Sequence, residues 1–282
     1  QKYLLRGAGM EREIKRDHYL EQLIVRKHNG LIKIVTGIRR CGKSYLLRTL
    51  FKKHLIESGI DENHIVEMAF DLFENKPYRN PDVFYPWATE QIKDDEKYYF
   101  LLDEVQMLDE FVSVLNGLAD RKNCDVYVTG SNARFLSRDI STEFGGRGDE
   151  VHMFPLSFSE FMTVYDGHKY DGWNEYVTYG GIPIVVLAST EEQKIKLLDN
   201  LFKETYIKDI VNRHKIRNAG EMEALLDFLA SAIGTLTNPY KLQKTFKSVN
   251  HSKITATTIT KYIDYLEDAF LVEEASRYDI KG

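Results

Sequence analysis

A glycine-rich segment that ends in a lysine and a serine carries the strongest chemical signal in the sequence. Gly37-Ile38-Arg39-Arg40-Cys41-Gly42-Lys43-Ser44 matches the pattern G-x-x-x-x-G-K-[ST] in full. In such a loop the backbone N–H groups surround a diphosphate, the lysine reaches the β- and γ-phosphates, and the hydroxyl takes one Mg²⁺ position. We therefore expect all eight residues to contact a nucleoside triphosphate, with Lys43 on its phosphates and Ser44 on Mg²⁺.

The segments on either side of this loop are those that a phosphate-binding loop requires. A near-continuous apolar run at 31–36 predicts a strand buried on both faces of a parallel sheet. After the loop, apolar residues recur at helical spacing until Gly59, which predicts the end of a helix. A simple Gly/Lys turn, the alternative, would need neither element.

Two adjacent carboxylates close a second apolar run, 98–104. Asp103 is suited to holding Mg²⁺, and Glu104 to polarising an attacking water. GTPases and small-molecule kinases generally lack such a glutamate, and the chain has no Asn-Lys-x-Asp guanine reader, because Asn75-Lys76 continues with Pro77-Tyr78. The pair therefore favours ATP hydrolysis, and a solvated strand end is the alternative.

A third predicted strand, 125–129, leads into two small polar residues, Ser131 and Asn132. In ATPases of this layout, a polar side chain at that strand tip contacts the γ-phosphate or the attacking water. Either residue could take this role, and an ordinary Gly-Ser-Asn turn is the alternative.

Further segments extend the pattern beyond these motifs. They are Leu102–Gln106, Thr129–Ser131, Gly146-Arg147, Pro155–Phe161, Tyr179–Pro183, Tyr206–Ile210 and Tyr262–Leu271. With the glycine loop, they resemble prokaryotic AAA-superfamily P-loop ATPases close to the archaeal ATPases and origin-recognition proteins, specifically those with a C-terminal domain of unknown function.

That resemblance implies several roles. Lys43 and Ser44 would bind phosphate and Mg²⁺, Asp103 and Glu104 would serve metal and water, and Ser131 would be a sensor. Arg147 would contact the γ-phosphate, either in cis or from a neighbouring subunit. Relatives continue into a further domain, so we expect the chain to be truncated after Gly282.

The order of predicted elements gives an α/β fold with three units. Strands near 31–36, 64–70, 98–103, 125–129 and 149–154 alternate with helices, which predicts a parallel, doubly wound P-loop NTPase sheet (RecA/AAA-like). We assign residues 10–155 to the ATPase domain, 156–218 to a helical lid and 219–282 to a winged-helix-like domain that is incomplete. Residues 1–9 are expected to be a non-native leader before Met10.

The last predicted unit has a basic face. Helices at 221–233, 240–246 and 255–270, followed by a wing strand from 271, follow the order of a winged helix. No Asp or Glu occurs between Phe228 and Ile263. Duplex DNA is therefore an expected partner through Lys241, Lys244, Lys247 and Lys253, without sequence reading, because no arginine is present there to read guanine. Docking of a protein is the alternative.

Composition limits the remaining classes of protein. The net charge of −5 excludes a wholly basic nucleic-acid binder, and no apolar stretch could span a bilayer, so we expect a cytoplasmic location and no membrane partner. Of the two cysteines, Cys41 is expected to be reactive, because it lies near a helix N-terminus beside two cations. Two functional classes remain: a motor or loader that remodels DNA or protein, active as a homo-oligomer, and a slow ATP-dependent switch that docks a protein partner.

Overall fold

A computed structural model describes residues 14–130, 144–249 and 254–275. It divides into two compact units, Gln1–Lys194 and Ile195–Gly282, which are described separately below. The predicted boundaries lay after residues 155 and 218. The division after Lys194 groups residues 156–194 with the sheet and 195–218 with the C-terminal helices, and the predicted domain boundaries stay predictions.

Five parallel strands form the sheet of the first unit, in the order β2-β3-β4-β1-β5. The strands are β1 (Ile32–Thr36), β2 (Ile65–Ala69), β3 (Tyr98–Asp103), β4 (Cys124–Thr129) and β5 (Gly148–His152). Every residue of β1 and β3 is buried, as their apolar runs predicted. All five predicted strands and the α/β fold class are thereby confirmed.

The strand order decides which side chains can meet. β4 lies between β1 and β3, with Val35 opposite Thr129 and Leu102 opposite Val128. Because the strands are parallel, the carboxyl ends of β1, β3 and β4 emerge at the same edge of the sheet. The glycine loop follows β1, and the two carboxylates close β3, so both reach this edge.

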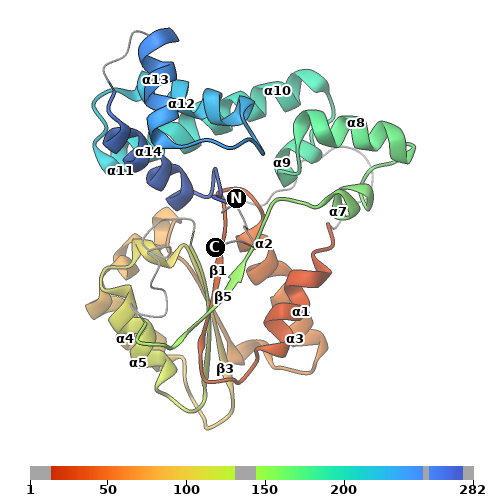
Figure 1. Ribbon diagram of the computed structural model, residues 1–282. Coiled ribbons are helices and arrows are strands. Elements are labelled where there is room, and N and C mark those ends of the chain that lie inside the picture. The colour runs from red at the N-terminus through yellow and green to blue at the C-terminus, as the bar shows by residue number, and fades with distance from the viewer. Residues whose placement is uncertain (1–13, 131–143, 250–253, 276–282) are drawn as a thin grey trace, which may run out of the picture. The chain divides into compact units, whose positions relative to one another are not determined.

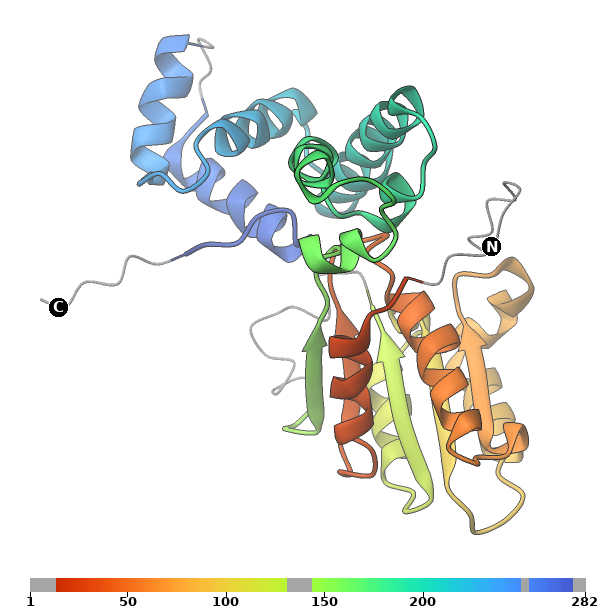
Figure 2. The same ribbon diagram turned by 90° about the vertical axis from the view of Figure 1, so that its right-hand side faces the viewer.

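Helices cover both faces of the sheet. One face carries α1 (Asp17–Val25) and the helix made of α2 (Lys43–Tyr45), a π-helical segment (Leu46–Phe51) and α3 (Lys52–Glu57). The other face carries α4 (Pro81–Glu90) and α5 (Phe111–Ala119). Figure 1 shows these two layers on either side of the strands, and Figure 2 views the sheet from the side of α1 and α3.

Each face has its own apolar core. Leu47 and Phe51 pack with Val35, Leu101 and Tyr127 beneath α1 and α3. On the opposite face, side chains of α4 and α5 pack with the alternate strand residues; they include Ile34, Phe84, Phe100, Leu102, Leu115 and Val128. Two buried faces fix the register of the strands, since a slip by one residue would exchange the two cores.

Short helices complete the first unit. They are 3₁₀ turns at Glu62–His64, Phe73–Arg79 and Val105–Met107, then α7 (Phe158–Met162), α8 (Lys169–Tyr179), α9 (Pro183–Val186) and α10 (Glu191–Asn200), whose last residues belong to the second unit.

The second unit is helical in its described part. After α10 it contains a π-helical segment (Leu201–Ile207), α11 (Lys208–His214), α12 (Ala219–Ser231), α13 (Pro239–Val249) and α14 (Ala256–Asp268). Leu225, Leu242 and Ile259, one from each of the last three helices, lie in its core. These three helices confirm the predicted helix positions.

The predicted wing strand is not seen in the described residues. The chain is irregular over 271–275, and the rest of the expected strand lies outside the described ranges. Three helices in this order are therefore established, whereas a winged helix is not. Across the described segments, no helix is both long and apolar enough to cross a membrane.

Candidate active site

The glycine loop connects β1 to α2 in a conformation that needs its glycines. Gly37 has φ of +135°, and a Cβ on it would lie 2.1 Å from the carbonyl oxygen of Met153. Met153 follows β5, and its amide donates to Thr36 O at the end of β1 at 2.9 Å, which holds this chain segment against the start of the loop. Gly42, with φ of +105°, precedes the first residue of α2. The loop therefore turns back over a helix N-terminus, the geometry that favours anion binding.

Lys43 is directed into this loop. Its side chain is only 4% exposed, and its Nζ donates to Gly37 O at 2.8 Å and to Ile38 O at 3.0 Å. A buried ammonium held by carbonyl oxygens of the loop itself can exchange those weak partners for phosphate oxygens. Arg39 is half-buried and Arg40 is exposed, with φ of +70°.

A chain of hydrogen bonds joins the loop, β3 and β4. Ser44 Oγ donates to Asp103 Oδ1 at 2.9 Å, and Thr129 Oγ1 donates to the same oxygen at 2.5 Å. The Thr129 hydroxyl in turn accepts from the backbone N–H of Glu104 at 3.0 Å. Four residues from three separate elements therefore meet at one sheet edge.

Asp103 is the buried centre of that chain, at 3% exposure. Burial raises the pKa of the Asp103 carboxyl above its usual value; the hydrogen bond from Thr129 opposes the rise, the charge of Glu104 adds to it, and the bond from Ser44 opposes it. A divalent cation beside Asp103 would favour the ionised form.

The donor set fits Mg²⁺. Hydroxyl and carboxylate oxygens are ligands that Mg²⁺ takes, together with water and substrate phosphates. Within the described segments, no group of three or more His, Cys, Asp or Glu side chains could hold a metal ion. A cation here would therefore rely on Ser44, Asp103 and the phosphates themselves rather than on a protein cage.

Glu104 occupies an unusual backbone conformation at the end of β3. Its φ and ψ are 53° and 47°, left-handed for a non-glycine residue, which costs about 1–2 kcal/mol. Its carboxylate accepts a hydrogen bond from the side-chain amide of Gln106. Strained backbone conformations are frequent at functional sites. In this conformation the Glu104 amide donates to Thr129, and the residue remains half-buried.

Arg147 lies at the opposite edge of the sheet. Its backbone carbonyl accepts from Ile32 N at the start of β1, and its guanidinium bonds to Asp120 at 2.6 Å. The whole of β1, about 13 Å at 3.3 Å per residue, separates this position from the glycine loop. Because strand register places Arg147 at the end of β1 opposite the glycine loop, this position favours a contact from a neighbouring subunit over one in cis. A contribution from a neighbouring subunit stays a prediction.

Ser131 and Asn132 both lie outside the described residues, so the sensor assignment is untested. Thr129, which sequence reasoning passed over as part of a buried strand, is instead the described β4 residue that touches the site. A hydroxyl residue at the carboxyl end of the strand, after Val126, Tyr127 and Val128, was its one available signal in the sequence.

Comparisons with known proteins agree with this geometry. Residues 29–162 match the family model of an AAA domain, and residues 170–281 match a model described as a domain of unknown function. An uncharacterized protein of Haemophilus influenzae is 35% identical over 280 residues, which are 95% of this chain and 68% of that protein. The chain belongs to this AAA-domain family.

Two further proteins resemble this chain at lower identity. The protein MJ1544 of Methanocaldococcus jannaschii is 26% identical over 266 residues, which are 89% of this chain and 57% of that protein. A solved Walker-type ATPase of Pyrococcus abyssi superposes with a TM-score of 0.61, at 16% identity, over 91% of this chain and 90% of that one. This likeness shows the P-loop NTPase fold.

Cys41 of the AAA domain is not the exposed thiol that its position in the loop suggested. Its side chain lies in the core with Leu46 and Leu47. Burial raises the pKa of the Cys41 thiol, and the neighbouring Lys43 and Arg16 only partly offset this. The expectation of a reactive cysteine is therefore wrong, because desolvation outweighs the local positive charge.

The lysines expected to meet phosphates lie on α13 in the second unit, except Lys253, which falls outside the described residues. Lys241, Lys244 and Lys247 are exposed, whereas Leu242 and Phe246 are buried. α13 is therefore amphipathic, with its three lysines on the solvent face.

Proposed function

We propose that this AAA-domain protein is a Mg²⁺-dependent ATP hydrolase. The observation that supports this most strongly is the hydrogen-bond chain from Ser44 through Asp103 and Thr129 to Glu104. It joins a hydroxyl and a carboxylate that would suit Mg²⁺ to the phosphate loop and fixes the backbone of the glutamate that follows, an arrangement that a protein that only binds nucleotide would not need.

The residues divide the work as follows. The loop amides and Lys43 hold the β- and γ-phosphates, and Ser44 and Asp103 hold Mg²⁺. Mg²⁺, when bound, neutralises negative charge on the phosphate oxygens. Glu104 accepts a proton from the water that attacks the γ-phosphorus, the bond to the bridging oxygen breaks, and ADP and phosphate leave.

Lys43→Ala tests the phosphate assignment. We expect its MgATP affinity to fall about 10- to 100-fold, the range for a lost hydrogen bond to a charged group, as measured by calorimetric titration. Lys52→Ala is the matched control, because Lys52 continues the same helix but pairs with Glu67 at 2.5 Å. Equal affinities of both variants and the parent would overturn the loop assignment.

We also propose duplex DNA as the partner whose binding is coupled to the nucleotide. The support is the solvent face of α13, where three lysines stand in a stretch without any carboxylate from Phe228 to Ile263. Such a face suits phosphates in any sequence. Cytoplasmic location and assembly into a homo-oligomer, which would give Arg147 a neighbouring site, belong to the same proposal.

A further inference from the structure

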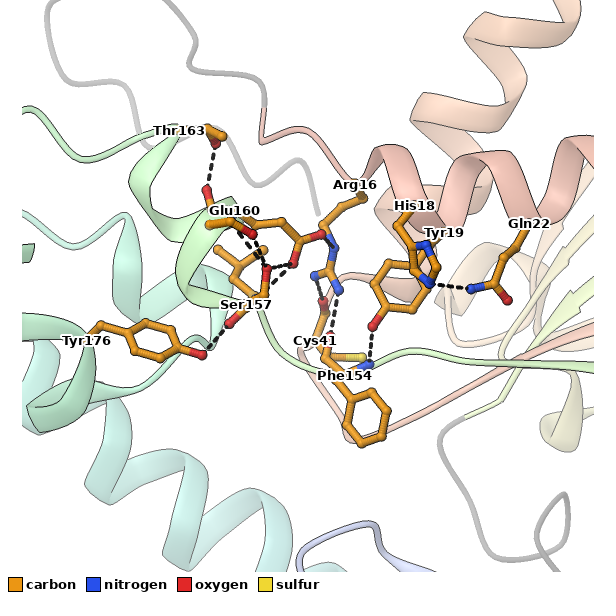
Figure 3. Close-up of polar contacts among 12 residues, drawn as sticks. Arg16, His18, Tyr19, Gln22, Cys41, Phe154, Ser157, Glu160, Thr163 and Tyr176 are labelled. Carbon is orange, nitrogen blue, oxygen red and sulfur yellow. Dashed lines mark hydrogen bonds and ion pairs between the residues drawn. The ribbon is translucent and has the colours of Figure 1, made fainter. Parts of the chain in front are cut away.

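Arg16 is a buried arginine that precedes α1 and touches three separate segments of the first unit. Its side chain is 2% exposed, and its guanidinium lies 4.6 Å from the centre of the Tyr19 ring. Figure 3 shows it between the glycine loop, the chain that leaves β5 and the start of α7. Burying a charge is costly unless it is paired, so the identity of these partners matters.

The first partner is the phosphate loop itself. Arg16 Nη1 donates to the carbonyl oxygen of Cys41 at 3.1 Å. The peptide between Cys41 and Gly42 is trans, like every described peptide bond, so its N–H points away from its C=O. The hydrogen bond from Arg16 to the Cys41 carbonyl therefore turns the Gly42 N–H in the opposite direction, away from the guanidinium.

The other partners hold Arg16 in place. Its Nη2 donates to Phe154 O at 2.6 Å, and its Nε forms an ion pair with Glu160 Oε1 at 2.9 Å. Glu160 is itself fixed, since its other carboxylate oxygen accepts from Ser157 N at 2.8 Å in the capping box of α7. The planar fork of arginine can span two carbonyls and a carboxylate at once, which a lysine cannot.

We infer that Arg16 is a positioning residue for nucleotide phosphate: it holds the Cys41 carbonyl so that the Gly42 amide faces the phosphates, and it ties the loop to the start of α7. This inference rests on the proposed function. Arg16 touches no reacting atom; it acts through the loop backbone. A purely structural role would also explain its burial, so the test must report on the Gly42 amide as well as on affinity.

Arg16→Met in the full chain is the decisive variant, with Arg26→Met as its control. Arg26 is a second, partly buried arginine at the far end of α1, with one carboxylate contact (Asp149, 2.9 Å) and one carbonyl contact (Gln22, 3.0 Å). Neither contact touches the loop. Calorimetric titration with MgADP gives the affinity, and selective ¹⁵N-glycine labelling follows the Gly42 amide resonance.

We expect Arg16→Met to bind MgADP about 10-fold or more weakly, the size of one lost hydrogen bond to a charged group. The Gly42 amide shift on MgADP addition should shrink in the same variant, while Arg26→Met matches the parent in both. If Arg16→Met does not fold, Arg16→Lys carries the test, with an intermediate loss because lysine can hold only one carbonyl.

Parental affinity in the folded variants, or weaker affinity with an unchanged Gly42 shift, would overturn the inference. Failure of the parent chain itself to bind MgADP would instead overturn the proposed function, so the two failures are distinguishable.

Discussion

Thr129 links the two acidic residues of the site through one hydroxyl, which donates to the Asp103 carboxylate and accepts from the backbone N–H of Glu104. Removing that hydroxyl would leave the Glu104 N–H without this acceptor and would let burial raise the pKa of Asp103 further, because the bond from Thr129 lowers it. The residue is therefore more than a packing element of β4.

Thr129→Val should lower stability by about 1–3 kcal/mol, the cost of a buried unsatisfied group, and should reduce ATP turnover. Without the Thr129 hydroxyl, the pKa of Asp103 should be higher than in the parent, so the carboxylate is protonated at a higher pH. On acidification, the variant should therefore lose Mg²⁺-dependent nucleotide binding at a higher pH than the parent. Denaturant unfolding and MgATP titrations across pH measure the two effects. Thr129→Ser, which keeps the hydroxyl, should stay close to the parent; equal losses in both variants would contradict the role of the hydroxyl.

The two thiols give a second test at this scale. Burial raises the pKa of Cys41, and burial likewise raises that of Cys124 to about 11. Less thiolate is then present at neutral pH, so alkylation of both thiols should be slow there, and alkylation of Cys124 should rise about tenfold per pH unit up to about pH 10. Peptide mass spectrometry should find half-buried Cys124 labelled before Cys41. Rapid labelling of Cys41 that MgADP prevents would contradict its burial.

Strands were the elements that the sequence predicted most closely, since a strand buried on both faces must be apolar throughout. β1 and β3 therefore begin and end within a residue of expectation, and Ser44, just after the glycine loop, contacts Asp103 at the end of β3. Contacts between residues far apart in the sequence have no comparable local sequence pattern from which they could be predicted. Arg16 reaches residues 25 to 144 positions away, and no periodicity reports that.

Two of the local arguments lacked the same kind of information. Arg147 was assigned from a short motif without the register of β5, which places it at the other edge of the sheet. Cys41 was assigned from neighbouring charges without the core that encloses its side chain. In both cases tertiary context, which sequence spacing does not contain, overrode a local argument.

At the scale of one element, α13 carries the expected DNA contacts. Lys241→Glu, Lys244→Glu and Lys247→Glu together should abolish binding of duplex DNA, while turnover without DNA stays at the parental level. In the parent, the logarithm of affinity should fall with the logarithm of salt concentration, with a slope of about −0.9 for each phosphate neutralised. Fluorescence anisotropy at several salt concentrations measures this.

A control triple variant carries the same change of charge on the first unit. Lys76, Lys93 and Lys122 are exposed there, so their replacement by Glu alters net charge equally without touching α13. Equal loss of DNA binding in both triple variants would show that the effect comes from the overall charge of the protein and not from the lysines of α13. Absence of DNA binding by the parent at about 50 mM salt would favour a protein partner for this face.

For the whole molecule, the rate of the proposed ATP hydrolysis distinguishes a motor or loader from a switch. The chain spans 68% of the Haemophilus influenzae protein and 57% of MJ1544. Turnover above about 1 s⁻¹, the low end for enzymes, that rises with DNA would indicate a motor or loader. Slow turnover with retained nucleotide would indicate a switch, in which the second unit releases its partner after hydrolysis.

Both possibilities require that the chain hydrolyses ATP through Glu104, and one variant measures this directly. Glu104→Gln keeps the length and the hydrogen-bonding end of the side chain but removes its basicity. Phosphate release from MgATP and MgATP affinity should be measured in parallel on the variant and the parent. We expect affinity within a few-fold of the parent and phosphate release lower by about 100-fold or more, the usual contribution of a general base. Parental phosphate release by Glu104→Gln would contradict the central claim.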